Sequence, residues 1–108
     1  MFKINPSPTF TCQVQLTVPG QAELASIEVE FRHMSRPALK AWLEGGETKS
    51  ELEFVGAAIA GWNGIADDDG ELTYSESSLE RLLNNYPAAA GELVNAYLRA
   101  LKESRIKN

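Results

Sequence analysis

The residues whose types and spacing would support chemistry gather in an acidic turn, Asp-Asp-Asp-Gly at 67–70. An EF-hand calcium loop needs oxygen ligands at positions 1, 3, 5 and 12 and a glycine at position 6. Counted from Ile65, positions 3, 5 and 12 are Asp67, Asp69 and Glu76, and the glycine also falls in place. Ile65, however, has no side-chain oxygen for position 1. The pattern therefore favours a solvated β-turn, with a degenerate calcium site at Asp67, Asp69 and Glu76 as the alternative.

Other catalytic or metal-binding patterns are missing from the sequence. The chain has one histidine, His33, and one cysteine, Cys12, so a transition-metal site lacks ligands and no internal disulfide can form. No glycine-rich phosphate loop and no nucleophile–base pattern is present, and the carboxylates do not single out a pair. We therefore expect a protein that is not an enzyme and that needs no cofactor.

Composition limits the partners. The 108 residues carry a net charge of −5, which disfavours nucleic acid and anionic membrane surfaces as partners. The hydrophobic fraction is 44%, enough for a core, yet no apolar run has the length of a membrane span. With one cysteine and no signal region, the cytosol is the simpler location. We expect a single domain over residues 1–108.

Two segments near the N-terminus predict a pair of antiparallel strands. Residues 9–18 alternate strictly between apolar and polar side chains, and residues 27–32 repeat the alternation. Pro19-Gly20 between them is typical of a turn. Cys12 lies on the apolar side of the first strand, so we expect it to be buried as a small hydrophobe. Because two strands alone are marginally stable, the strand pair at about 9–32 must pack on helices.

The rest of the chain, about 35–103, predicts four helices. The first begins at Ser35 and ends at Gly45-Gly46, and the second spans 48–60. The third follows the cap residue Ser75, and the fourth starts after Pro87; a short strand at 71–74 and a frayed tail at 104–108 are also expected. The expected fold class is α+β, with an N-terminal antiparallel β-hairpin or small sheet packed against about four α-helices.

The middle of the sequence also resembles a known family. A tryptophan-containing segment at 61–65 leads into the acidic turn, and a polar–aromatic–serine step at 73–75, a leucine helix and Tyr86-Pro87 follow. This order, with the opening Met-Phe-Lys-Ile and the basic, polar ending, is similar to the tail assembly chaperones of long-tailed bacteriophages and prophages. The resemblance covers most of the chain.

The resemblance implies a non-enzymatic chaperone in the host cytoplasm that binds the tape-measure protein and recruits tail-tube subunits. It also implies release before the mature virion is complete, and the family includes a longer form made by ribosomal frameshifting. A chaperone needs an apolar surface, which we expect on the last two helices, together with the tryptophan segment, and which would also support self-association. The candidate partner-binding residues are Trp62, Leu79, Leu82, Leu83, Leu93, Tyr97, Leu98 and Leu101. The alternatives are a calcium-binding interaction domain or a structural or accessory tail protein.

Overall fold

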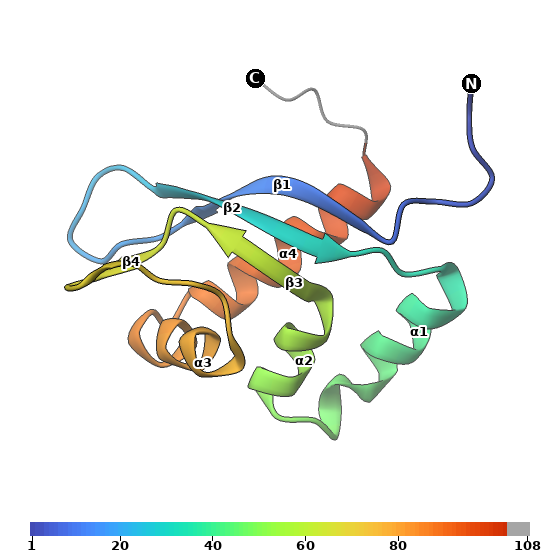
Figure 1. Ribbon diagram of the computed structural model, residues 1–108. Helices are drawn as coiled ribbons and strands as arrows, with labels where there is room; N and C mark the ends of the chain where they lie inside the picture. The colour runs from blue at the N-terminus through green and yellow to red at the C-terminus, as the bar shows by residue number, and fades with distance from the viewer. Residues whose placement is uncertain (104–108) are drawn as a thin grey trace.

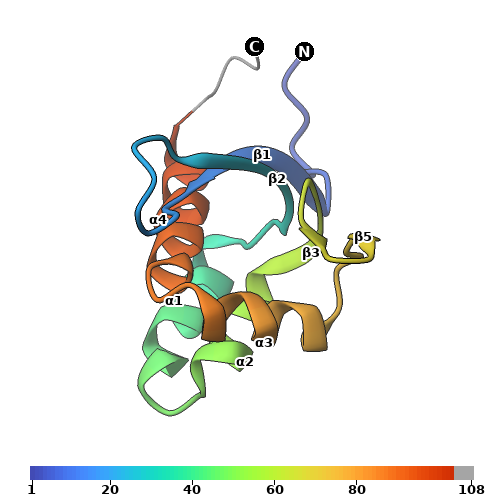
Figure 2. The same ribbon diagram turned by 90° about the vertical axis from the view of Figure 1, so that its left-hand side faces the viewer.

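A computed structural model describes residues 1–103, which form an α+β fold (Figure 1). An antiparallel sheet with the strand order β1-β2-β3 consists of β1 (Thr9–Leu16), β2 (Ala25–Arg32) and β3 (Ile59–Asn63). In both views α1 (Arg36–Glu44), α2 (Glu51–Ala58) and α3 (Glu76–Asn85) lie below this sheet, and α4 (Ala89–Lys102) passes along β1 (Figures 1 and 2). The predicted class and the N-terminal strand pair are confirmed.

The strand pair forms because its side chains alternate in register. Thr9 pairs with Arg32 and Leu16 with Ala25, so every apolar residue of β1 shares a face with an apolar residue of β2. Val14, Val29 and Phe31 on that face are buried, whereas the threonines, glutamines and glutamates of the other face are mostly exposed. The sheet therefore has one face for the core and one for solvent.

Local capping determines where α1 and α2 begin. Ser35 accepts a hydrogen bond from the backbone N–H of Ala38, and Ser50 accepts one from that of Glu53. A single 3-10 turn, η1 (Gly45–Glu47), follows α1 and reverses the chain. The predicted first helix and its glycine end are confirmed.

The prediction of one helix over residues 48–60 was wrong at its C-terminal end. The helix α2 stops at Ala58, and the chain continues as β3, which pairs with β2. Ile59 and Trp62 lie opposite Phe31 and Val29 and are buried there, and a β-bulge leaves Ala60 as the extra residue without an opposite residue in β2. Burial against β2 therefore outweighs the helical preference of the alanines at 57, 58 and 60, a tertiary effect that periodicity does not reveal.

The acidic turn is a small hairpin, with β4 (Ala66–Asp67) paired to β5 (Gly70–Glu71). It confirms the predicted turn, but the strand expected at 71–74 is wrong beyond Glu71. Tyr74 and Leu72 instead turn inward and pack against the core. A capping box then starts α3, in which the side chains of Ser75 and Ser78 bond each other's backbone N–H groups.

One core joins the sheet to the helices. Its buried apolar residues come from every element except η1 and the β4–β5 hairpin, and they are Val14, Leu16, Ile27, Val29, Phe31, Trp42, Val55, Ala58, Ile59, Trp62, Leu79, Leu82, Leu83, Ala89, Leu93 and Tyr97. Cys12 is partly buried beside this core, close to the expected burial. The predicted frayed tail at 104–108 lies outside the described residues.

Removing the Ser78 hydroxyl should destabilise the fold through the start of α3. This hydroxyl is buried, accepts from the Ser75 N–H at 2.7 Å and donates to the Thr73 carbonyl at 2.9 Å. Ser78→Ala should lower the free energy of unfolding by ~1–2 kcal/mol in urea titrations, because those groups lose their partner. Ser77→Ala, at the exposed neighbouring position, is the matched control and should change little. Equal effects of the two substitutions would contradict this role.

Candidate partner-binding surfaces

Tyr97 of α4 is the centre of an aromatic cluster under the sheet. Its ring stacks on Phe10 with centroids 6.1 Å apart, lies 5.0 Å from the ring of Phe31, and meets Trp42 edge-on at 5.4 Å. Its hydroxyl donates a 2.6 Å hydrogen bond to the backbone carbonyl of Arg32. Tyr97 is fully buried, so it connects β1, β2, α1 and α4 and is not on the surface of the folded chain.

Burial also changes the acidity of two tyrosines. Desolvation raises the pKa of Tyr97 to about 12, because the phenolate form would be buried without water. Burial likewise raises the pKa of Tyr74, and the neighbouring Arg32 guanidinium opposes that rise. Both hydroxyls are therefore neutral donors at ordinary pH.

The predicted binding residue Trp62 is also part of the core. Its ring is 7% exposed, its Nε1–H donates to the Leu72 carbonyl at 2.8 Å, and Tyr74 packs edge-on against it at 5.0 Å. These contacts hold the segment after the β4–β5 hairpin against β3. Trp62 thus positions the acidic turn relative to the sheet.

The leucines of α3 lie against α2 and α4. Leu79 is fully buried, Leu82 and Leu83 are each 9% exposed, and Leu93 of α4 is 1% exposed. They are buried because they form the inner stripes of two amphipathic helices, of which α3 packs on α2 and α4, and α4 packs on β1. A binding role for these four residues stays a prediction, and it would require that the chain expose them.

Leu98 and Leu101 are placed differently from the other candidates. Both are partly exposed on α4, next to the buried Tyr97, and Val94 and Ala90 extend this apolar flank along the helix. Spacings of three and four residues put these four side chains on one side of α4. Of the eight predicted binding residues, only Leu98 and Leu101 therefore reach the surface of the fold.

The side chains of the alternative calcium site are not arranged as ligands. Asp67 accepts a hydrogen bond from the Asp69 N–H at 2.9 Å, and its other oxygen lies 3.5 Å from an Arg81 nitrogen. The Asp67 carboxylate therefore orders its own turn and ties it to α3. Across residues 1–103 there is no group of three histidine, cysteine or acidic side chains that could hold a metal ion. Asp67, Asp69 and Glu76 therefore do not form such a group.

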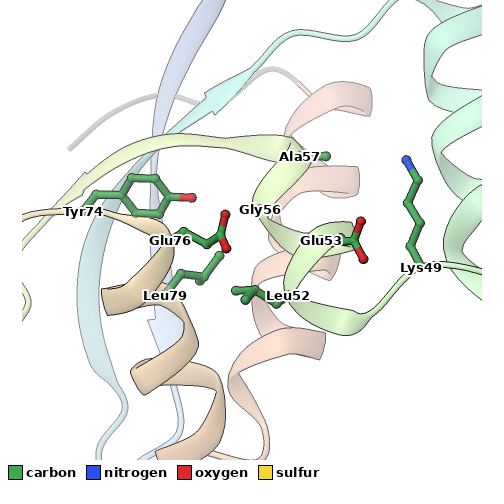
Figure 3. Close-up of a pocket in the computed structure, with 8 residues that line it drawn as sticks. All are labelled: Lys49, Leu52, Glu53, Gly56, Ala57, Tyr74, Glu76 and Leu79. Atoms are coloured by element: carbon green, nitrogen blue, oxygen red, sulfur yellow. The ribbon is translucent and has the colours of Figure 1, made fainter.

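A groove of about 320 Å³ lies between α2 and the start of α3 (Figure 3). Apolar groups from Leu52, Gly56, Ala57 and Leu79 line it, and Lys49, Glu53, Tyr74 and Glu76 supply its polar groups. The Tyr74 and Glu76 side chains reach toward α2, and Lys49 stands at the opposite end of the groove (Figure 3). It is open to solvent and suits one or two inserted side chains.

The segment before β1 carries the largest apolar exposure among the described residues. Phe2 is 90% exposed and Ile4 is 86% exposed, with Lys3 between them. A hydrogen bond from the His33 N–H to the Pro8 carbonyl, 2.9 Å long, fixes the point where this segment leaves the sheet. We call residues 1–7 the N-terminal arm; in both views it projects above the sheet, away from α2 and α3 (Figures 1 and 2).

Sequence reasoning missed both the groove and the arm. The groove depends on how closely α2 approaches α3, and the only sequence signal for it was the small side chains at 56–58. Pro6 and Pro8 exclude regular strand pairing in and next to the arm, so no element is expected there from the sequence. Its apolar Phe2 and Ile4, two residues apart, were the signal available in the sequence.

The described chain is thus a small α+β domain that keeps most large apolar residues in one core and offers an apolar helix flank, a groove and an arm outside. No helix within residues 1–103 is long and apolar enough to cross a membrane. In a comparison with known families, all of residues 1–108 match the family described as Phage tail assembly chaperone, and the chain belongs to that family. The comparison finds no match among curated proteins and none among solved structures.

Family membership gives the general role. The chain takes part in assembly of a phage tail inside the host cell and interacts with tail proteins. Membership of a chaperone family suggests a non-enzymatic role.

The buried hydroxyl of Tyr97 should make stability fall at alkaline pH. In the unfolded chain the tyrosine ionises near its ordinary pKa of 10.0, whereas in the fold its pKa is about 12. The difference between these two pKa values contributes to the free energy of unfolding. This contribution is complete below pH 10 and is lost as the pH rises toward 12, and it amounts to roughly 2–3 kcal/mol. In urea titrations, Tyr97→Phe should therefore lose less of its unfolding free energy over this interval than the parent chain.

Tyr86→Phe is the matched control, because Tyr86 is only partly buried. The comparison of the two variants separates the effect of the Tyr97 hydroxyl from the loss of a phenol hydroxyl elsewhere in the chain. Parallel slopes for Tyr97→Phe and the parent would contradict the raised pKa of Tyr97.

Proposed function

We propose that the chain binds the tape-measure protein, keeps it soluble and extended, and brings tail-tube subunits to it during tail assembly. The match of the whole chain to the tail assembly chaperone family is the observation that carries this proposal. The described surface supports it, because it offers apolar groups for a protein partner and no group of metal-binding side chains within residues 1–103.

The apolar flank of α4 is the best candidate for the contact with the tape-measure protein. Leu98 and Leu101 are partly exposed and can lose their remaining contact with water without unfolding the chain. An amphipathic helix of the partner would add to the flank by helix-on-helix packing. The buried Leu93 and Tyr97 would then support the flank by holding α4 on the core, and the leucines of α3 would pack against that core. Trp62 would act indirectly, by holding the segment after the β4–β5 hairpin against β3.

The proposal includes where and when the protein acts. It works in the host cytoplasm, uses no catalysis and no cofactor, and leaves before the mature virion is complete. A longer frameshifted form would carry the same fold and add a second contact to tail proteins. If the chain is instead a structural or accessory tail protein, mass spectrometry of purified virions will find it there in fixed proportion to the tail tube.

Co-expression with the tape-measure protein of the same genome tests the proposal directly. We expect the tagged chain to retain the tape-measure protein on an affinity resin and to raise its soluble yield. Retention should be the same with and without EGTA, because Asp67, Asp69 and Glu76 do not form a ligand group. Capture lost in EGTA would favour the calcium-dependent alternative, and no capture would count against the chaperone role.

A charge on the α4 flank should weaken this capture. Leu98→Asp places a carboxylate where the partner's apolar side chains would pack, and we expect at least a tenfold loss of affinity. Asn95→Asp adds the same charge to an exposed position of the same helix and is the matched control. Thermal melting must show that Leu98→Asp remains folded at the assay temperature; equal capture by both folded variants would place the contact elsewhere.

A further inference from the structure

Two features of the described chain fit each other and are not used by the contacts above. One is the groove between α2 and α3, and the other is the N-terminal arm. Large apolar side chains standing free in water are unusual for a monomer, and they mark a contact when they occur together. Phe2 and Ile4 therefore require a surface that can cover them.

The groove matches the arm in size. Its volume of about 320 Å³ is near the lower end of ligand sites, roughly 300–1,000 Å³. It is too small for a helix to enter but takes one or two large side chains. Phe2 and Ile4 are such side chains, and in an extended arm both point to the same side.

The groove also matches the arm in charge. Lys3 stands between the two apolar residues, and the groove carries Glu53 and Glu76 with Lys49 at the far end. When Phe2 and Ile4 face the apolar floor formed by Leu52, Gly56 and Ala57, Lys3 projects toward the rim. Glu76, at the Tyr74 end and away from Lys49, offers it an exposed carboxylate (Figure 3).

The arm of one molecule does not lie near its own groove. Both views show the arm above the sheet and the α2–α3 region below it (Figures 1 and 2). The hydrogen bond from the His33 N–H to the Pro8 carbonyl holds the base of the arm next to the C-terminal end of β2. A contact between the two features therefore joins different molecules.

We propose that the N-terminal arm of one copy docks in the α2–α3 groove of a second copy, with Phe2 and Ile4 on the apolar floor and Lys3 against Glu76. Such a contact is heterologous, because it joins different patches of the two copies, so one copy can receive an arm and donate one at once. The buried surface is small, and the association is weak and concentration-dependent. This inference does not rest on binding of the tape-measure protein.

Sedimentation equilibrium of the full chain over a range of concentrations tests the proposal. The weight-average mass should rise with concentration, and Phe2→Ala should weaken the association about tenfold or more, because it removes most of one buried aromatic side chain. Leu24→Ala, which removes a 56% exposed leucine from the β1–β2 connection, is the matched control and should leave the association unchanged. Neither substitution removes a core contact, so both variants should keep the parent's melting temperature.

Charge reversal tests the docked arrangement. Lys3→Glu and Glu76→Lys should each weaken the association, and the double variant should restore it. A labelled peptide of residues 1–8 should bind the parent chain, and Ala57→Arg, which places a long side chain over the groove, should abolish that binding. A monomer at every concentration, an unchanged Phe2→Ala variant, or a double variant as weak as the single ones would overturn the proposal.

Discussion

The fold depends on the burial of Tyr97 between the sheet and the helices. Its ring contacts aromatic side chains from β1, β2 and α1, and its hydroxyl satisfies the Arg32 carbonyl at the end of β2. A three-stranded sheet with one solvated face cannot hold itself together without a layer on its other face. Tyr97 supplies the largest fully buried part of that layer, so α4 cannot leave the sheet without exposing it.

Arg32 connects this centre to the second half of the chain. Its guanidinium donates to the carbonyls of Gly56, Ala57 and Ile59, where α2 ends and β3 begins. These carbonyls lie at and just after the C-terminus of α2, where a cation interacts favourably with the negative end of the helix dipole. The change from helix to strand at Ala58 is thereby stabilised from β2, and β3 can carry Trp62 to its place over the acidic turn.

The parts of the fold that local pattern determines could be predicted. The alternation that begins at residue 9, the serine caps at 35 and 75 and the acidic turn all have local physical causes, and each occurs where the sequence places it, although β1 ends at Leu16. The strand β3 could not be predicted, because its partner is far away in sequence and the alanines at 57, 58 and 60 favour helix. The candidate binding residues were chosen as apolar stripes, and a stripe alone does not say whether it covers a core or a partner.

This ambiguity explains which candidate surfaces remain. The fold uses six of the eight predicted residues to close its core, so a partner cannot reach them without paying the cost of opening α3 or α4. Outside the core of the described residues lie the Leu98–Leu101 flank, a groove of limited volume, an arm whose apolar side chains contact little, and the single exposed leucines Leu24 and Leu43. A chain in the tail assembly chaperone family that works by binding must therefore bind through small surfaces. The proposed release of partners at the end of assembly would suit contacts of this limited size.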